Sequence, residues 1–218
     1  MLNRKTFAWK TLFAWKTLAS VLAIVIPLSV ALGQGLPNLD NGPEKRVPAL
    51  EANWPNWLPK TAGQCPADVM SRHQADPLDF SIERCTQAFD QCLSSCRSGS
   101  AGDCYGAALV GQRVSEGDLA HALFLRACVL GVTSGCTNHA AKTDMTDDGN
   151  ACAIRTFELA CERDDPWACS MIGFHLIRGT GVTKDHARAR KMLSKSCKYG
   201  PDDQACQAGR SLLREIEN

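Results

Sequence analysis

Eight of the cysteines in this 218-residue chain form four pairs that recur in a nearly constant register. Seven or eight residues separate the two members of a pair, and the first members follow one another at steps of 32, 33 and 36 residues. The pairs are Cys96/Cys104, Cys128/Cys136, Cys161/Cys169 and Cys197/Cys206. A period of this length is the signature of a repeat array in which each unit stacks on its neighbour. The chain from about Ser81 onward is therefore predicted to consist of repeats.

The last complete repeat has the periodicity of two amphipathic helices. From Ala168 onward, apolar and small residues recur at intervals of three and four, as on one face of a helix. Gly179 and Gly181 can adopt the positive φ that ends the first helix, and Thr183 is placed to cap the second. We therefore expect helix–turn–helix pairs, with helices over residues 81–97, 102–114, 118–130, 134–146, 150–162, 166–178, 184–198 and 203–216.

Two further columns of the repeat predict how the helices pack. The residue four positions before the first cysteine is large and apolar in three of the four repeats, and this column reads Cys92, Phe124, Phe157 and Leu193. We expect it to be buried. The column that contains Gly173 otherwise holds Ala108 and Ala140, and such small residues suit a close crossing of two helices.

The segment from Ala168 to Val182 resembles a Sel1-like repeat. The family pattern A-x-x-x-L-G-x-x-Y-x-x-G-x-G-V is met with Ile172 in place of Leu and Leu176 in place of Tyr. The cysteine placement is similar to that of the disulfide-rich, exported Sel1-like repeat proteins of bacteria. The resemblance covers roughly residues 81–218 and weakens in the earlier repeats, where the glycine-rich turn is missing after Val114. It implies an all-α fold, a right-handed α-solenoid of stacked helix–turn–helix repeats of the Sel1 and tetratricopeptide kind.

The cysteine content favours disulfides over a metal site. Twelve cysteines are several times ordinary usage, and the chain contains no C-x-x-C of the kind found in zinc or thioredoxin-type sites. In a stacked repeat the end of one helical pair lies beside the start of the next, within reach of a disulfide. Each of the four bridges would close a loop of nine or ten residues, which contributes about 2.5–3 kcal/mol in the loop-entropy treatment.

Four cysteines remain outside these pairs, namely Cys65, Cys85, Cys92 and Cys152. Three connectivities are open to them. If Cys85 and Cys92 lie on one helix, they are about 10 Å apart along its axis and cannot bridge. We therefore prefer a bridge from Cys65 to Cys85 or Cys92, which leaves Cys152 as a buried thiol.

The first 33 residues have the three parts of a secretory signal. Basic residues precede an apolar run from Leu18 to Leu32, and the small residues Ala31 and Gly33 suit cleavage before Gln34. The alternative is an uncleaved membrane anchor, although the run is shorter than the roughly 20 residues of a usual span. We expect an exported protein, periplasmic or secreted, that meets a membrane only through this segment if it is uncleaved.

Residues 34–80 are expected to form a Pro-rich linker and a leading segment with little secondary structure, ahead of a repeat domain over residues 81–218. Half of the ten prolines fall between residues 34 and 64. Trp54 and Trp57 flank Pro55 in this stretch. They are interpreted either as a docking motif for a partner or as side chains that pack back on the first helix.

No catalytic motif is found. The chain lacks S-x-x-K, S-D-N, K-T-G, G-x-S-x-G and H-E-x-x-H. Cys136 and His139 form a C-x-x-H step that could serve a metal, but the register already assigns Cys136 to a disulfide. The formal net charge of +1 gives no excess that would favour nucleic acid. We expect no cofactor, no metal and no enzymatic activity.

The favoured function is a scaffold that binds a protein or peptide on the concave face of the solenoid. The residues predicted to form this surface are Arg113, Lys142, Phe174, His175 and Arg178. The family resemblance also implies two alternatives. One is a hydrolase that acts on a cell-wall-like or β-lactam substrate, and the other is a redox or assembly factor like the Sel1-like protein of the mitochondrial intermembrane space.

Overall fold

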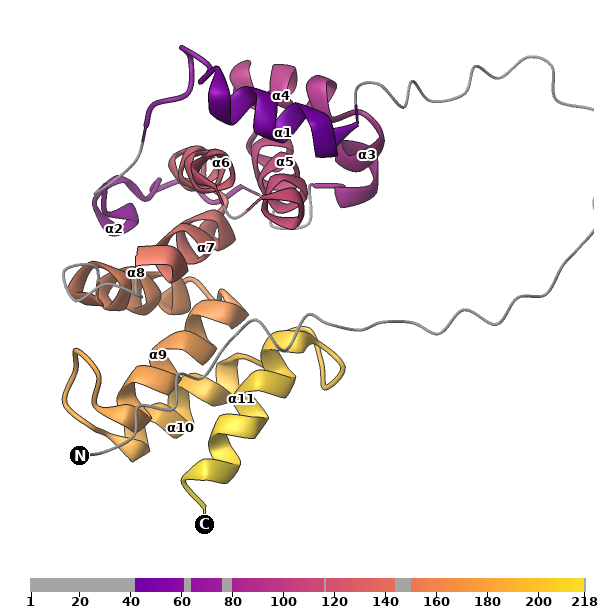
Figure 1. Ribbon diagram of the computed structural model, residues 1–218. Helices are drawn as coiled ribbons and strands as arrows, with labels where there is room; N and C mark the ends of the chain where they lie inside the picture. The colour runs from indigo at the N-terminus through magenta and orange to yellow at the C-terminus, as the bar shows by residue number, and fades with distance from the viewer. Residues whose placement is uncertain (1–41, 61–63, 76–79, 116, 144–149, 218) are drawn as a thin grey trace, which may run out of the picture. The chain divides into compact units, whose positions relative to one another are not determined.

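Every secondary-structure element in the described part of the chain is a helix. The computed structural model describes residues 42–60, 64–75, 80–115, 117–143 and 150–217, so the signal-like segment lies outside it. These residues belong to one unit, Leu36–Asn218. Its eleven helices within the described ranges (Figure 1) are α1 (Pro43–Ala52), α2 (Pro66–Val69), α3 (Ile82–Gln87), α4 (Phe89–Arg97), α5 (Ala101–Val114), α6 (Asp118–Val129), α7 (Thr133–Thr143), α8 (Asn150–Glu162), α9 (Pro166–Arg178), α10 (His186–Lys195) and α11 (Gln204–Glu215).

The ends of the helices follow from local capping. At the start of α9 the Asp165 carboxylate accepts a hydrogen bond from the Ala168 amide, and Asp203 plays the same part for α11. Gly179 ends α9 at φ 70°, in the left-handed region that was predicted for it. The prediction that Thr183 caps the next helix is wrong. Because α10 begins at His186, the residue in the capping position is Asp185, whose carboxylate accepts from the Arg188 amide.

Successive helices from α4 to α10 pack on one another in chain order, and α11 packs on both α9 and α10. The predicted apolar column is confirmed, since Cys92, Phe124, Phe157 and Leu193 are each 0% exposed. The close helix crossing predicted for the small-residue column is confirmed at Gly173. A Cβ atom added at Gly173 would lie 2.6 Å from Cγ of Leu193 and closer still to its Cδ2, so α9 and α10 approach too closely for a side chain there.

Six disulfides tie these helices together. Four of them are the predicted pairs Cys96–Cys104, Cys128–Cys136, Cys161–Cys169 and Cys197–Cys206, with Cα–Cα distances between 4.2 and 4.7 Å. Each connects two consecutive helices across the turn between them, and Cys197 lies in the turn itself, two residues after the end of α10. No cysteine is left as a free thiol.

The two remaining disulfides differ from the prediction. Cys85 is bonded to Cys92 at a Cα–Cα distance of 5.6 Å. The expected single helix is broken at Ala88, with φ −133° and ψ 57°, and this kink brings the two cysteines within bridging distance. Cys65 is bonded to Cys152 on α8, so the preferred pairing of Cys65 with Cys85 or Cys92 is wrong, and Cys152 is not a thiol.

The leading segment contains more structure than its prolines suggested. Pro43 occupies the first turn of α1, where its missing N–H is not needed. Val47 of α1 and Leu58 after it are 1% and 2% exposed in the core that α3–α6 form. Trp54 and Trp57 are half-buried against the same core, as the packing interpretation predicted. Tertiary burial therefore fixes α1 where composition favoured an extended linker.

A second part of the leading segment, residues 65–75, runs along α6–α8 and is called the strap below. Its short helix α2 packs on α6, α7 and α8. The Ala75 amide donates to the Gly131 carbonyl at 3.0 Å, and Arg163 Nη1 donates to the Ser71 carbonyl at 2.5 Å. Within the described ranges, no helix is both long enough and apolar enough to cross a bilayer.

Candidate partner-binding surfaces

The structure brings part of the predicted binding surface together where α9 meets α11. Phe174 is half-buried on α9, and the Arg178 guanidinium carbon lies 5.5 Å from the centre of its ring. Arg178 Nη2 is also 2.5 Å from Oε2 of Glu215 on α11. The spacing of four residues places the aromatic ring and the cation on one face of the helix. The result is an exposed cation held over an aromatic side chain.

His175 does not belong to this surface, contrary to the prediction. It is 2% exposed, its ring stacks on Phe157 with the centroids 5.9 Å apart, and its Nδ1 is 3.0 Å from the backbone oxygen of Thr180. The residue lies on the side of α9 that faces α8. Its role is therefore structural, because it fixes the turn that follows α9.

The structure does not join Lys142 and Arg113 to Phe174 and Arg178. Lys142 Nζ is 2.7 Å from Oδ1 of Asp118, an ion pair that connects α7 to α6 and lowers the pKa of the Asp118 carboxyl. Arg113 is exposed in the last turn of α5. Within the described residues, neither cation forms a hydrogen bond or ion pair with Phe174 or Arg178.

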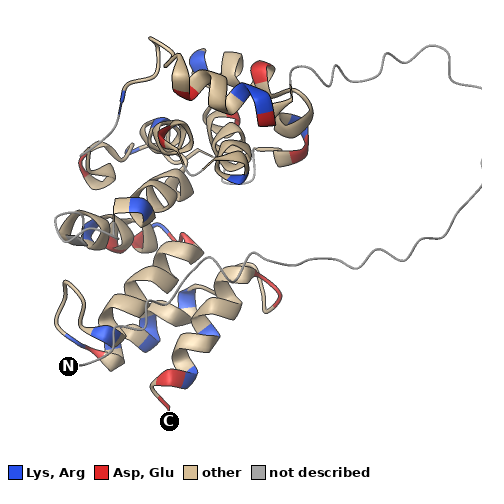
Figure 2. Cartoon of the chain, viewed as in Figure 1, with Lys and Arg blue, Asp and Glu red and all other residues tan. Residues whose placement is uncertain are grey.

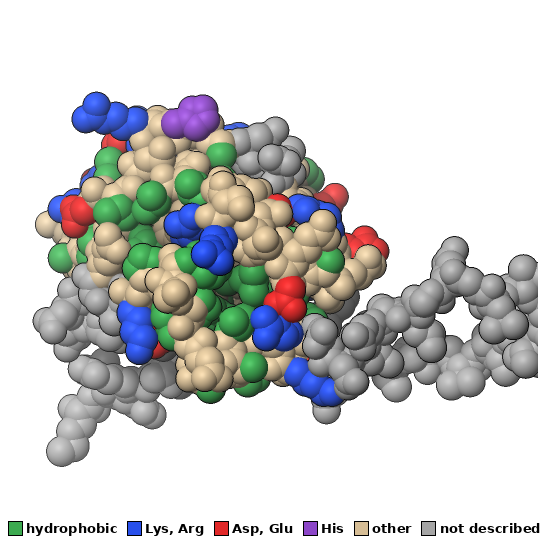
Figure 3. All heavy atoms as spheres, turned by 90° about the horizontal axis from the view of Figure 1, so that it is seen from above, with side chains coloured by type: hydrophobic (Ala, Val, Ile, Leu, Met, Phe, Trp, Pro, Cys, Tyr) green, Lys and Arg blue, Asp and Glu red, His purple; other side chains and the backbone are tan. Residues whose placement is uncertain are grey.

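A second surface, which the sequence did not predict, is a groove between α1 and α4. It has a volume of about 220 Å³, and its lining consists of Arg46, Leu50, Pro55, Trp57, Asp90, Leu93, Ser94 and Arg97. Figure 3 shows hydrophobic side chains gathered on this face, with basic side chains around them. Arg46 Nη2 spans the two helices to Asp90 Oδ1 at 2.7 Å. The Arg126 guanidinium carbon lies 5.5 Å from the centre of the Trp57 ring.

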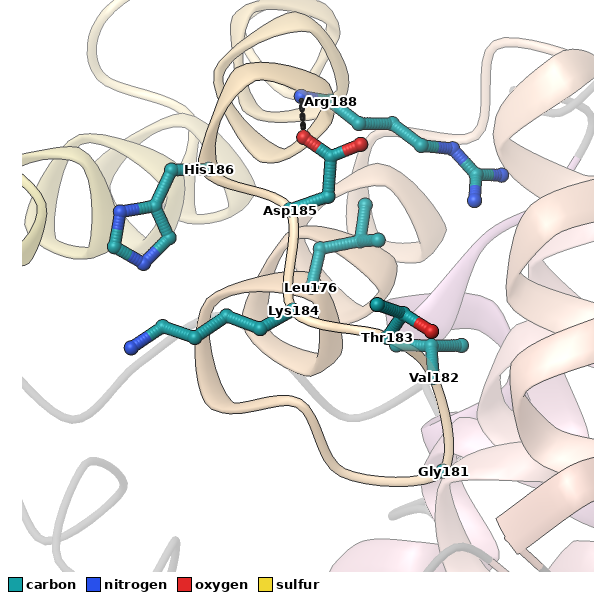
Figure 4. A pocket seen from close by; sticks show the side chains of 8 residues that line it. All are labelled: Leu176, Gly181, Val182, Thr183, Lys184, Asp185, His186 and Arg188. Atoms are coloured by element: carbon teal, nitrogen blue, oxygen red, sulfur yellow. Dashed lines mark hydrogen bonds between the residues drawn. The ribbon is translucent and has the colours of Figure 1, made fainter.

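A third hollow, of about 690 Å³, lies at the turn between α9 and α10. Its lining is Leu176, Gly181, Val182, Thr183, Lys184, Asp185, His186 and Arg188 (Figure 4). The polar side chains diverge, since Lys184 and His186 extend to one side and Arg188 to the other. Arg188 Nη2 binds Glu158 Oε1 at 2.7 Å, and the Asp185 carboxylate caps α10. The labelled side chains do not converge on a point where a substrate could react.

In both candidate metal sites the potential ligand atoms already take part in other bonds. Cys136 is bonded to Cys128, and His139 Nδ1 lies 2.8 Å from the His121 carbonyl, so the C-x-x-H step does not form a ligand pair. Cys85, Cys92 and Asp103 offer three ligand atoms within 4.8 Å of one another. The two sulfurs are bonded to each other, however, and Asp103 forms an ion pair with Arg84. A metal would require the disulfide to be reduced first.

Two histidines pack against each other between α6 and α7. The rings of His121 and His139 lie 6.2 Å apart, and Nδ1 of His121 is buried without a hydrogen-bond partner among the described atoms. Burial, with a further contribution from Lys142, lowers the pKa of His121 to about 4. Burial also lowers the pKa of His139. Both rings are therefore neutral at pH 7.

A buried carboxylate joins α7 to α9. Asp165 accepts hydrogen bonds from Ser134 Oγ at 2.5 Å, from Thr137 Oγ1 at 3.0 Å and from the Ala168 amide at 2.8 Å. Burial raises the pKa of this carboxyl. Because its oxygens are satisfied by hydrogen bonds inside the protein, Asp165 fixes the contact between α7 and α9 and is not placed to act on a ligand.

Comparison with known proteins adds no identification. No protein-family model matches the chain, and searches of curated proteins and of solved structures also find no match. The resemblance to Sel1-like repeats therefore depends on the residues from Ala168 to Val182 and on the register of the cysteines.

Proposed function

We propose that this protein is an exported helical-repeat scaffold that binds an acidic protein or peptide at the surface formed by Phe174 and Arg178. In this proposal α4–α11 form a right-handed solenoid of Sel1-like pairs whose first helices line the binding face. The main observation in support is that Arg178 is held over the ring of Phe174 by Glu215 of the neighbouring helix. A cation above an aromatic side chain is a common element of protein-binding surfaces, where Arg and aromatic residues dominate the energetics.

The charge distribution around this surface favours an acidic partner. Together α10 and α11 contain six Lys and Arg residues and one Glu, and Figure 2 marks basic positions in blue along these helices. Although the whole chain has a formal charge of only +1, its C-terminal helices are locally basic. Complementary charge raises the association rate and selects against basic partners.

The disulfides support the same function in a second way. Cys161–Cys169 and Cys197–Cys206 fix the connections that precede α9 and α11. A surface on helices that are already fixed loses little conformational entropy when a partner binds. Six disulfides are also typical of proteins from oxidising compartments, which agrees with export.

The test uses the purified protein to capture partners from the extract of the compartment in which it resides. Arg178→Ala and Phe174→Ala are each expected to weaken capture of the main partner roughly tenfold or more. Arg155→Ala is the matched control, because Arg155 lies on α8, is comparably exposed, 54% against 46% for Arg178, and also pairs with a carboxylate, that of Asp68. Equal capture by all three variants, with unchanged far-UV circular dichroism, would place the binding surface elsewhere, and the groove with Trp57 would be tested next.

A further inference from the structure

The disulfide between Cys65 and Cys152 differs from the other five in its exposure. Both of its cysteines are partly exposed. Four of the other bridges have two buried cysteines, and the fifth joins half-buried Cys197 to buried Cys206. Because a thiolate must reach a sulfur atom to attack it, this exposure favours attack on Cys65–Cys152 over attack on the other bridges.

The two sulfurs of this bridge have different surroundings. Arg155 Nη2 lies 3.4 Å from Sγ of Cys65, and Thr156 Oγ1 lies 3.9 Å from the same sulfur. The same Arg155 nitrogen is 2.5 Å from Oδ1 of Asp68, so a carboxylate competes for the cation. A neighbouring guanidinium stabilises a thiolate, which makes Cys65 the better leaving group of the pair.

We propose that Cys65–Cys152 is a thiol–disulfide exchange site for an external dithiol. One thiolate of the dithiol attacks Sγ of Cys152, the bond between the two protein sulfurs breaks, and its electron pair stays on Cys65 as a thiolate beside Arg155. The dithiol is then joined to Cys152 through a mixed disulfide. Its second thiol loses a proton and attacks its own sulfur in that mixed disulfide, which releases Cys152. The dithiol ends as a disulfide, and the protein has gained two electrons and two protons.

Exchange at this site would break the covalent bond between the strap and α8, while the five other disulfides of the protein stay intact. The strap would still be held by the ion pair between Asp68 and Arg155 and by the hydrogen bonds of Ser71 and Ala75 to the repeats. Val69 and Met70 also remain packed on the hydrophobic clusters of the repeats. The reduced protein is therefore expected to remain folded, and the reverse exchange, in which the disulfide form of the dithiol takes up the two electrons and two protons, can remake the bond.

The experiment exposes the oxidised protein to a small excess of dithiothreitol, stops the reaction with an alkylating reagent at successive times, and maps the labelled cysteines by mass spectrometry. Cys65 and Cys152 are expected to be labelled roughly tenfold faster than any other pair. A parallel reaction with glutathione, which has one thiol, should place the adduct on Cys152 and the alkyl group on Cys65. Earlier labelling of a buried pair, or an adduct on Cys65, would overturn the proposal.

Three variants test the role of the cation. Arg155→Gln should slow reduction of this bridge roughly twofold to fivefold, because it removes the positive charge beside the leaving sulfur. Asp68→Asn should accelerate it, because the competing carboxylate is neutralised. Arg188→Gln is the matched control, since Arg188 is comparably exposed, 46% against 54% for Arg155, and also pairs with an acidic residue. If the Cys65–Cys152 bridge is reduced at the same rate in Arg155→Gln as in Arg188→Gln, Arg155 does not direct the exchange.

Discussion

The close approach of α9 and α10 predicts that Gly173→Ala destabilises the protein, although alanine is the better helix former. In the interior of a helix this substitution ordinarily gains about 0.5–1 kcal/mol. Here the new Cβ would lie 2.6 Å from Cγ of Leu193, whose side chain is 0% exposed and packed in the core. Overpacking of this kind costs about 1–3 kcal/mol. We therefore expect a net loss of about 0.5–2 kcal/mol in the free energy of unfolding.

Gly111→Ala is the matched control, because Gly111 lies in the interior of α5 and its added Cβ would meet Cβ of Ala120 at 3.6 Å, an ordinary contact. This substitution should stabilise the protein by about 0.5–1 kcal/mol. Both values are measured by denaturant unfolding under non-reducing conditions, followed by circular dichroism. In a background of Leu193→Ala, the overlap disappears and Gly173→Ala should stabilise as well. If Gly173→Ala stabilises the unmodified protein as much as Gly111→Ala does, the steric argument is refuted.

Three further changes have defined outcomes in the same unfolding assay. Replacing Cys65 and Cys152 together by alanine should lower the free energy of unfolding by about 4–5 kcal/mol, because the bridge spans a sequence separation of 87 residues. A decrease of less than about 1 kcal/mol would contradict the loop-entropy argument. His121→Gln should reduce the loss of stability as the pH falls from 6.5 to 4. In this range the unfolded chain takes up a proton on His121, whereas the folded protein stays neutral there because the pKa of His121 is about 4. The same substitution at exposed His73 is its control. Burial raises the pKa of Asp165 in the folded protein above its value in the unfolded chain, about 3.9. The folded protein therefore holds this proton more tightly. The resulting stabilisation is complete below about pH 3.9 and is lost as the pH rises through the pKa of the folded state. Asp165→Asn should therefore lose less stability than the unmodified protein between pH 3 and 7, and an equal loss would contradict the assignment.

The sequence was sufficient where structure depends on neighbouring residues. Helices from α5 to α11 follow the period of 3.6, and the turn after α9 has glycine in the left-handed region where the pattern required it. The partners of the four disulfides across turns could be predicted because the two cysteines of each are only eight or nine positions apart. Phe174 and Arg178 could be placed together because four residues make one turn of helix.

The predictions failed where distant segments meet or where a break has no local signal. Neither glycine nor proline marks the kink at Ala88, so the bridge from Cys85 to Cys92 was excluded on the assumption of a straight helix. The partner of Cys65 lies 87 residues away, beyond the reach of any periodicity. The groove between α1 and α4 was missed for the same reason, because it exists only once α1 has packed against the core that α3–α6 form.

The bond from Cys65 to Cys152 makes residues 65–152 a covalent ring. Three disulfides, Cys85–Cys92, Cys96–Cys104 and Cys128–Cys136, lie wholly inside the ring, and the other two lie wholly in the C-terminal tail that leaves it. A protease that cuts one peptide bond within the ring leaves a single covalent molecule, because the two pieces stay joined until a reductant is added. A cut between Cys152 and Cys161 instead releases the tail at once. Electrophoresis with and without reductant therefore distinguishes a cut in the ring from a cut in the tail outside its two disulfide loops, Cys161–Cys169 and Cys197–Cys206, before any fragment is sequenced.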